Sequence, residues 1–409
     1  MTVTVVVTVV GIGADGWAGL SDPGRAAVRA AEVVLGGPRQ LDLVAGHTEA
    51  EPVPWPSPML PALPGLFDEL RGRRVCALAS GDPMWHGVGA TLARVLGPDA
   101  VEVLPHPSSV SLACARLGWP VDAVEVVTVV GRPLARVRRV LAPGRRVLVL
   151  SAGADTPAEL AALLAADGWG ASELTVLDQL GGPDEQRTTG TAADWAHPPG
   201  DPLNVVAIRC AAGPDARRHG ETPGLPDDAY DHDGQLTKRE VRAVTLALLG
   251  PRPGERLWDV GAGSGSVAIE WLRAHPACTA VAVESDRARA ARITANADAL
   301  GVPALRVVTG RAPDALAGLT EPDAVFVGGG LTRRGVLDAC WTALRPGGRL
   351  VANAVTLEAE AVLVAGLARH GGSLTRIAVE RAEPLGTFTG WRPARAVTIW
   401  SVAKGGERG

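Results

Sequence analysis

The stretch that most constrains the fold of this chain is residues 257–270, which read LWDVGAGSGSVAIE. An apolar run ends in a turn with glycine at 261, 263 and 265, and a helix is expected to follow from Val267. Strand, glycine turn and helix in this order form the first unit of a doubly wound α/β domain. Glycine lets the backbone approach a ligand closely, and the helix that follows presents free N–H groups to it. The pattern therefore predicts a site for a nucleotide-like ligand.

The segments that follow the glycine turn continue the α/β alternation. A second apolar run, 280–283, ends at Glu284. A carboxylate at the tip of the second strand accepts hydrogen bonds from the two hydroxyls of a ribose. The remaining periodic segments predict strands and helices in turn. The expected strands are 305–308, 324–327 and 349–355, and the expected helices are 287–300 and 333–344.

The spacing of the glycines favours one class of ligand. A nicotinamide-dependent domain would have G-x-G-x-x-G, but here the third glycine is one place early, with Ser266 where that fingerprint has its last glycine. The G-x-G-x-G spacing, the acidic strand tip and the P-G-G-R-L turn at 346–350 resemble class I S-adenosylmethionine (SAM) methyltransferases. A dinucleotide-binding domain is the alternative. By carry-over from the resemblance, SAM contacts are expected at Thr237, Gly261, Ala262, Gly263, Ser264, Gly265, Glu284 and Ala312.

The length and composition of the chain set limits on its class. With 409 residues it exceeds the size at which a single core stops growing, so two or more domains are expected. A net charge of −4 indicates no bulk attraction to nucleic acid. The N-terminal apolar run is too short to cross a bilayer and has no basic leader, and the five cysteines form no C-x-x-C pair. We therefore expect a cytoplasmic protein with buried, inert thiols, no membrane partner and no metal, since the short run at 231–233 is a poor metal site.

The N-terminal half is also α/β in pattern. A strand at 3–10 leads into a glycine turn, a helix is expected at 23–34, and the proline-rich stretch 51–65 is expected to be a loop. Residues 1–212 are expected to fold as two lobes, about 1–118 and 119–212, followed by a linker at 213–234 and a second domain at 235–405. Thr237 and Glu240 form a capping box, which predicts a helix from Lys238 to Leu249. The other expected strands of this half are 75–79, 101–104, 124–130, 146–150, 174–177 and 203–208, with a helix at 156–166.

Three loops of the N-terminal half resemble the tetrapyrrole methylase family. They are VGIGADG (10–16), SGDPMWHG (80–87) and PHPSSVS (105–111), each after an expected strand, and LGGPDEQ (180–186) and DPLNVVAI (201–208) also match. The first loop departs from the family's G-x-G-P-G-D, because Asp15 is one place early and the proline is missing. The resemblance implies two α/β lobes with SAM in the cleft between them. Gly81 and Asp82 are the expected cofactor contacts, and Ser108 and Ser109 either contact substrate or cap a helix.

The C-terminal half resembles decarboxylating precorrin methyltransferases. The matching segments are LTKREVRA (236–243), DVGAGSGSVAIE (259–270), VES (283–285), GRAPDAL (310–316) and VGGG (327–330). The two halves in this order resemble the bifunctional precorrin methyltransferases of cobalamin biosynthesis. That resemblance implies methylation of carbon 5 by the first half, and methylation of carbon 15 with decarboxylation of the ring C acetate by the second. It also implies a tetrapyrrole (precorrin) substrate and a homo-oligomer.

The substrate implied by the resemblance carries many carboxylates, so arginines near the site are expected partners. Arg333 and Arg334 follow the 328–330 glycine run at the carboxyl end of a strand, where open α/β sheets bind ligands. Both could equally be surface arginines in an arginine-rich chain. No catalytic side chain is predicted, because methyl transfer depends mainly on proximity and alignment. The rival functions are an RNA methyltransferase and a non-catalytic SAM-binding protein.

Overall fold

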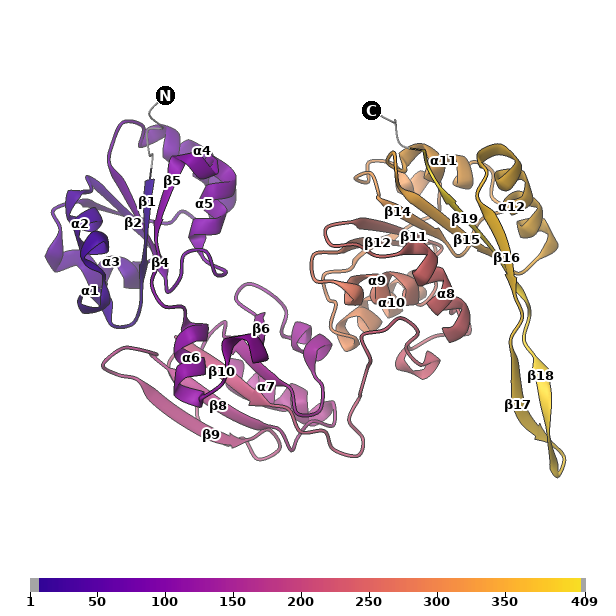
Figure 1. Ribbon diagram of the computed structural model, residues 1–409, viewed down its shortest axis with the longest axis horizontal. Coiled ribbons are helices and arrows are strands. Elements are labelled where there is room, and N and C mark those ends of the chain that lie inside the picture. Colours follow the sequence, from indigo (N-terminus) through magenta and orange to yellow (C-terminus); the bar gives the residue numbers. More distant parts are fainter. Residues whose placement is uncertain (1–6, 406–409) are drawn as a thin grey trace. The chain divides into compact units, whose positions relative to one another are not determined.

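The computed structural model describes residues 7–405 and divides the chain into two compact units. The first contains the described residues up to Leu134 together with Leu141–Arg217, and the second contains Ala135–Val140 and the described residues from Arg218 onward. Both units are α/β, as predicted (Figure 1).

The first lobe of the first unit is a five-stranded parallel sheet in the order β3-β2-β4-β1-β5. Strands covered on both faces read as continuous apolar runs, and the side chains of β1 and β4 accordingly pack into two clusters, one on each face. The elements are β1 (Val7–Ile12), α1 (Gly16–Gly19), α2 (Asp22–Ala30), β2 (Val33–Gly36), α3 (Pro38–Val44), β3 (Glu51–Pro54), α4 (Met59–Glu69), β4 (Val75–Ser80), α5 (Val88–Leu96) and β5 (Val101–Leu104).

Two sequence predictions for this lobe are wrong. The helix expected at 23–34 ends at Ala30, because Val33 and Val34 are β-branched residues of the buried strand β2. The loop expected at 51–65 contains β3 and the start of α4: the prolines of β3 are tolerated at the edge of the sheet, and Pro58 is the N-cap residue of α4. Positions 3–6 of the expected first strand lie outside the described residues.

The second lobe is a mixed sheet in the order β6-β7-β10-β8-β9, in which only β6 and β7 pair in parallel. Helix α6 packs on it through Val110, Ala113 and Cys114. The exposed edge strand β9 was not predicted, since its sequence QRTTGT has no apolar face. The elements are α6 (Ser109–Leu117), β6 (Glu125–Thr128), β7 (Arg146–Leu150), α7 (Thr156–Ala166), β8 (Glu173–Asp178), β9 (Gln186–Thr191) and β10 (Asn204–Arg209).

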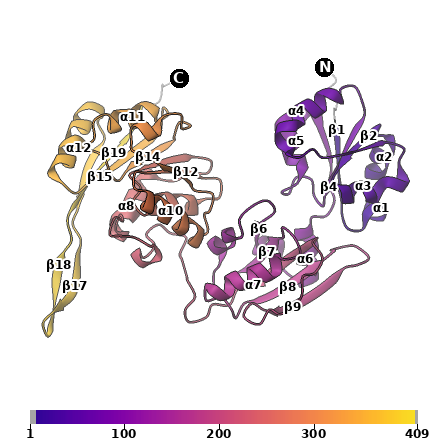
Figure 2. The same cartoon turned by 180° about the vertical axis from the view of Figure 1, so that it is seen from behind.

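The second unit is built on a seven-stranded sheet in the order β13-β12-β11-β14-β15-β19-β16, parallel except for β19. One core cluster packs α8, α9 and α10 on one face, and another packs α11 and α12 on the other (Figures 1 and 2). The elements are α8 (Arg239–Leu249), β11 (Arg256–Val260), α9 (Ser266–Ala274), β12 (Thr279–Glu284), α10 (Arg287–Ala299), β13 (Arg306–Thr309), β14 (Ala324–Val327), α11 (Val336–Ala343), β15 (Arg349–Ala354), α12 (Leu357–His370), β16 (Ser373–Ile377), β17 (Glu380–Leu385), β18 (Phe388–Pro393) and β19 (Val397–Ala403).

A long antiparallel hairpin, β17–β18, joins β16 to β19 and extends well beyond the sheet in both views (Figures 1 and 2). Leu385 and Phe388 at its tip and Trp391 further along β18 are exposed at 70%, 78% and 73%. No pattern in the sequence predicted this hairpin, because neither strand has a buried face.

Part of the segment expected as a linker packs into the second unit. Leu225 and Tyr230 are buried in its core, and the units divide between Arg217 and Arg218. Glu270 of α9 accepts hydrogen bonds from the backbone N–H groups of Gly224 (2.6 Å) and Leu225 (3.0 Å) and from the Tyr230 hydroxyl (2.8 Å). Its partner is the fully buried Arg242, whose Nε lies 2.6 Å away. This network holds residues 224–230 against α8 and α9.

Candidate functional site

The glycine turn after β11 folds back on the tip of β12. The N–H groups of Gly261 and Ala262 both donate to the Val283 carbonyl, at 2.9 and 3.2 Å. Gly263 has a φ of +59°, and a Cβ there would lie 2.7 Å from the Gln235 carbonyl oxygen. Any larger residue at 263 would therefore push the 234–237 segment away and fill the space beside it.

Glu284, at the tip of β12, is held by the turn and has hydrogen-bonding capacity left. It is 5% exposed, and its Oε2 accepts from Gly263 N–H and its Oε1 from Asp286 N–H, both at 2.9 Å. A carboxylate oxygen has two lone-pair sites, and Oε1 also accepts from the Ser285 hydroxyl at 3.4 Å, so Oε2 is the oxygen that can still accept a bond from a ligand hydroxyl. The contact of Glu284 with a ribose stays a prediction.

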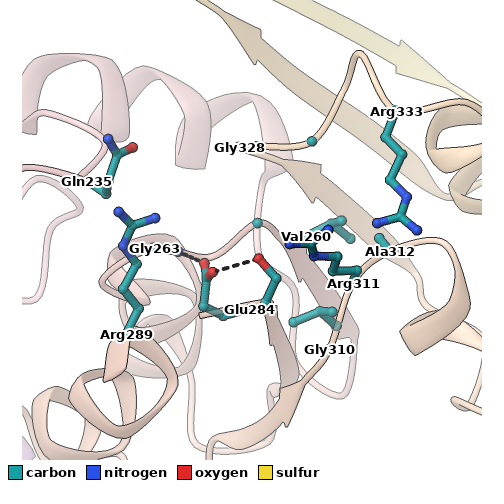
Figure 3. Close-up of a pocket in the computed structure, with 15 residues that line it drawn as sticks. Gln235, Val260, Gly263, Glu284, Arg289, Gly310, Arg311, Ala312, Gly328 and Arg333 are labelled. Carbon is teal, nitrogen blue, oxygen red and sulfur yellow. Dashed lines mark hydrogen bonds between the residues drawn. The ribbon is translucent and has the colours of Figure 1, made fainter. Parts of the chain in front are cut away.

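A pocket of about 430 Å³ opens at the carboxyl ends of β11, β12, β13 and β14 (Figure 3). Its volume lies within the range of roughly 300–1,000 Å³ usual for small-molecule sites. In Figure 3, Glu284 lies between Gln235 and Arg289 on one side and Ala312 and Arg333 on the other. We call this the cofactor pocket. Its lining residues are Gln235, Val260, Gly261, Gly263, Val283, Glu284, Ser285, Arg289, Gly310, Arg311, Ala312, Gly328, Gly329, Gly330 and Arg333.

A second pocket, of about 410 Å³, lies on the other side of the glycine turn. It shares Gln235, Gly261, Gly263 and Gly328 with the cofactor pocket, so the two are contiguous. We call it the ring pocket, and both pocket names refer to the occupants that the sequence resemblance leads us to expect. The start of α8, the end of β15 and the ends of β16 and β19 line it.

The structure brings five of the predicted C-terminal contacts together in the cofactor pocket. These are Gly261, Gly263, Glu284, Ala312 and Arg333. Thr237 and Ala262 line the ring pocket instead. Ser264, Gly265 and Arg334 line neither pocket.

Two of these residues have other roles in the fold. Thr237 does not cap α8, because the N-cap residue is Lys238 and no side chain bonds to the helix N–H groups there, so the capping-box prediction is wrong. Gly265 has a φ of +78°, and a Cβ there would lie 2.7 Å from a methyl group of Ile293. The third glycine of the turn thus lets α10 pack against the start of α9.

A buried carboxyl group lies beneath the turn. Asp259, in β11, accepts a hydrogen bond from Ala268 N–H (3.0 Å) through Oδ2, and its Oδ1 is buried without a partner. Burial raises the pKa of Asp259 to about 7, and the negative charge of Glu284 acts in the same direction. The Ala268 hydrogen bond opposes both effects.

In the first unit, a pocket of about 420 Å³ lies between the strand ends of the two lobes. All four residues predicted there, Gly81, Asp82, Ser108 and Ser109, line it. Asp82 Oδ1 also accepts from Met84 N–H (2.8 Å), and Ser108 Oγ accepts from Ser111 N–H (3.0 Å) as the N-cap of α6. Capping and pocket lining therefore occur together at Ser108.

The aspartate of the unusual first loop lies outside this pocket. Asp15 Oδ2 pairs with Nε2 of the buried His106 at 3.2 Å, and His106 Nδ1 contacts the Pro107 carbonyl at 3.1 Å. This pairing ties the 11–16 loop to the 105–111 loop, which indicates a structural histidine.

Sequence reasoning missed several lining residues. In the cofactor pocket these are Gln235, Arg289 and Arg311, and in the pocket of the first unit they include Arg39 and Trp55. Arg289 sits on the first turn of α10 and holds Asp233 (2.8 Å), which lowers the pKa of that carboxyl to about 2. The sequence held one signal for Arg289: it lies in the first turn of the helix that follows the acidic strand tip, close to the expected ligand.

Among residues 7–405, no group of three or more His, Cys, Asp or Glu side chains is placed to hold a metal ion. Within the same residues, no helix has the length and apolar character needed to span a bilayer. All five cysteines are free and buried, and burial raises the pKa of Cys76 and Cys340 to about 12.

The fold and the site define the class of this protein. A glycine turn at the central strand of a parallel sheet, followed by a carboxylate at the next strand tip, is the arrangement of Rossmann-like nucleoside-binding domains. Two family profiles match the chain: "Tetrapyrrole (Corrin/Porphyrin) Methylases" over residues 6–196 and "Precorrin methyltransferase domain" over residues 228–404.

Curated relatives identify the family. A precorrin-6Y C(5,15)-methyltransferase [decarboxylating] of Mycobacterium tuberculosis is 50% identical over 402 residues, which cover 97% of this chain and 100% of the relative. One from Sinorhizobium sp. is 51% identical over 398 residues, covering 97% and 96%. The crystal structure of the C-terminal domain of the Rhodobacter capsulatus enzyme is 48% identical, covers 46% of this chain and 100% of that one, and has a TM-score of 0.44. The chain belongs to the family of decarboxylating precorrin-6Y C(5,15)-methyltransferases.

Proposed function

We propose that this enzyme uses SAM to methylate precorrin-6Y at carbons 5 and 15 and removes carbon dioxide from the ring C acetate, giving precorrin-8X in cobalamin biosynthesis. The first unit would methylate carbon 5, and the second would methylate carbon 15 and decarboxylate. The observation that supports this most directly is that each unit has its own pocket, at the strand ends where α/β folds bind ligands.

The residues of the cofactor pocket fit SAM. The free acceptor capacity of Glu284 suits a ribose, and the space beside Gly263 exists only because that residue has no Cβ. Ala312 would line the adenine side, and Gln235 and Arg289, on the opposite side of Glu284, would lie toward the amino-acid end with its carboxylate. SAM supplies an electrophilic methyl group whose leaving group departs neutral.

The role of the protein in methyl transfer is to align the reacting carbon with that methyl group. The ring pocket and the cofactor pocket meet at Gln235, Gly261, Gly263 and Gly328, so a ring bound in one pocket faces a donor bound in the other. Proximity of this kind lowers the barrier without acid–base help. The walls of the ring pocket exclude water from the reacting edge.

The experiment is incubation of the full chain with precorrin-6Y and SAM, followed by mass spectrometry. We expect a product two methyl groups heavier and one carbon dioxide lighter. A product carrying a single added methyl group, or one that keeps its carboxyl groups, would reject the proposal. Titration with SAM in a calorimeter is expected to give two sites per chain.

We also infer that the second unit assembles with copies of itself through the β17–β18 hairpin. The apolar side chains of Leu385, Phe388 and Trp391 on the hairpin have little cover, and such exposed apolar side chains mark association surfaces. Phe388→Asp together with Trp391→Asp should lower the mass measured by light scattering. An unchanged mass for the double variant would contradict this inference.

The free, buried thiols suit a reducing cytosol, which supports a cytoplasmic enzyme.

A further inference from the structure

We propose that the ring pocket distinguishes the carboxylate that is lost from those that are kept. In this assignment, the neutral amide of Asn353 holds the acetate that leaves, and Arg395 holds a carboxylate that remains. The inference rests on the proposed function and goes beyond it by giving two side chains different tasks.

Asn353 places a polar amide, whose oxygen is buried, at the edge of the ring pocket. It lies at the carboxyl end of β15, lines the ring pocket, and donates from Nδ2 to Oγ1 of the fully buried Thr245 of α8 at 3.0 Å. Its Oδ1 is buried with no partner. An unsatisfied buried oxygen destabilises the folded chain, and an apolar residue at this position would avoid that cost. The second N–H of the amide has no partner among the described residues and is available to a ligand.

The charges around the ring pocket are mostly paired. Arg381 pairs with Glu240 at 2.5 Å, and Lys238 pairs with Asp227 at 3.6 Å. Arg395 makes no ion pair or side-chain hydrogen bond within residues 7–405. It is therefore the cation of this pocket, among the described residues, that is ready to receive an anionic group of a ligand.

The wall next to Asn353 is apolar. Val355, Ile377, Val379 and Val397 line it, and Val355 remains 53% exposed at the mouth. A flat conjugated ring would cover this surface, and a carboxylate placed against it would lose much of its water.

The chemistry decides which group holds which carboxylate. In the decarboxylation, the C–C bond to the carboxylate breaks, its electron pair enters the conjugated ring, and carbon dioxide leaves. The pair is used in the new bond from carbon 15 to the methyl group, so one carboxylate charge and one sulfonium charge disappear together. A guanidinium bound to the departing carboxylate would stabilise the reactant more than the transition state. A neutral donor in apolar surroundings orients the group with far less of this effect.

The test uses full-chain variants and follows both methyl groups and carbon dioxide by mass spectrometry. Methylation of carbon 5, a reaction of the first unit, is the internal control in every sample. Asn353→Leu should slow the carbon 15 step about tenfold or more, since a bond to a charged group is lost. Because the variant also removes the donor to Thr245, the rate is measured well below the unfolding temperature of its second unit. Asn353→Asp should slow the carbon 15 step further, because a second negative charge faces the acetate.

Arg395→Gln should raise KM for the ring about tenfold in the carbon 15 step and leave kcat and the ratio of carbon dioxide to methyl unchanged. Arg369→Gln is the matched control, an exposed arginine of α12 paired with Asp338 outside the pocket, and should change nothing. Wild-type rates in Asn353→Leu, or a loss of kcat in Arg395→Gln as large as the change in KM, would overturn the assignment. Absence of decarboxylation in the wild type would instead reject the proposed function.

Discussion

Asp259 illustrates how a single residue beneath the site makes stability depend on pH. Its pKa in the folded chain is about 7, above the ordinary value of 3.8, so the folded state keeps a proton that the unfolded state has lost between these two values. The contribution of the Asp259 proton to the stability of the folded state is complete below about pH 4 and is lost as pH rises through 7.

We predict that Asp259→Asn removes this dependence. Between pH 5 and pH 7, the unfolding free energy of the wild type should fall relative to that of the variant by about 1.4 kcal/mol per pH unit. Chemical denaturation of the second unit at several pH values measures it. A difference that stays constant over this range would show that Asp259 titrates normally.

A substitution at Gly265 tests whether this glycine is needed for α10 to pack against the start of α9. Gly265→Ala combines a positive φ with a Cβ 2.7 Å from Ile293, whereas Gly318 has a similar φ of +73° and open space around it. We predict that Gly318→Ala costs about 1 kcal/mol of unfolding free energy and Gly265→Ala clearly more, by about 1–3 kcal/mol of overpacking. Thermal unfolding of both variants provides the comparison, and equal losses would contradict the packing role.

At the scale of elements, the buried Arg242–Glu270 pair fixes the 224–230 segment to α8 and α9. Glu270→Gln leaves the fully buried guanidinium with only the more distant, partly exposed Asp227 carboxylate (3.3 Å) as a counter-charge, which should cost on the order of 3 kcal/mol. Glu383→Gln, which removes an exposed pair with Arg392 on the hairpin, should change the unfolding free energy much less. Similar losses in the two variants would mean that the buried network contributes little.

The elements also show what could be predicted from the sequence. The buried strands β4, β7 and β14 were placed closely, because apolar runs bounded by turns identify them. Strand β9 and the β17–β18 hairpin were missed, since their exposed side chains carry no period.

The site was predictable in part for a similar reason. Gly263 and Glu284 belong to one local sequence pattern, a glycine turn after one strand and a carboxylate at the tip of the next, which is typical of nucleotide-like ligand sites. Gln235, Arg395 and Asn353 are brought to the site from separate segments by the sheet order, which no local spacing encodes.

At the scale of the whole molecule, we propose one cofactor site in each unit. Gly263 and Gly81 both have positive φ and both line a pocket, so the same substitution can be made in each unit. Gly263→Arg should leave one SAM site and Gly81→Arg the other, each seen as a single site by calorimetry. Loss of both sites in either variant would mean that the units do not bind the cofactor independently.

The most direct test of the central claim is the mass of the product that full-length Gly263→Arg makes from precorrin-6Y and SAM. We expect a ring with one added methyl group and all of its carboxyl groups, because the first unit still works and the second does not. A product with two added methyl groups and one carbon dioxide lost would contradict it.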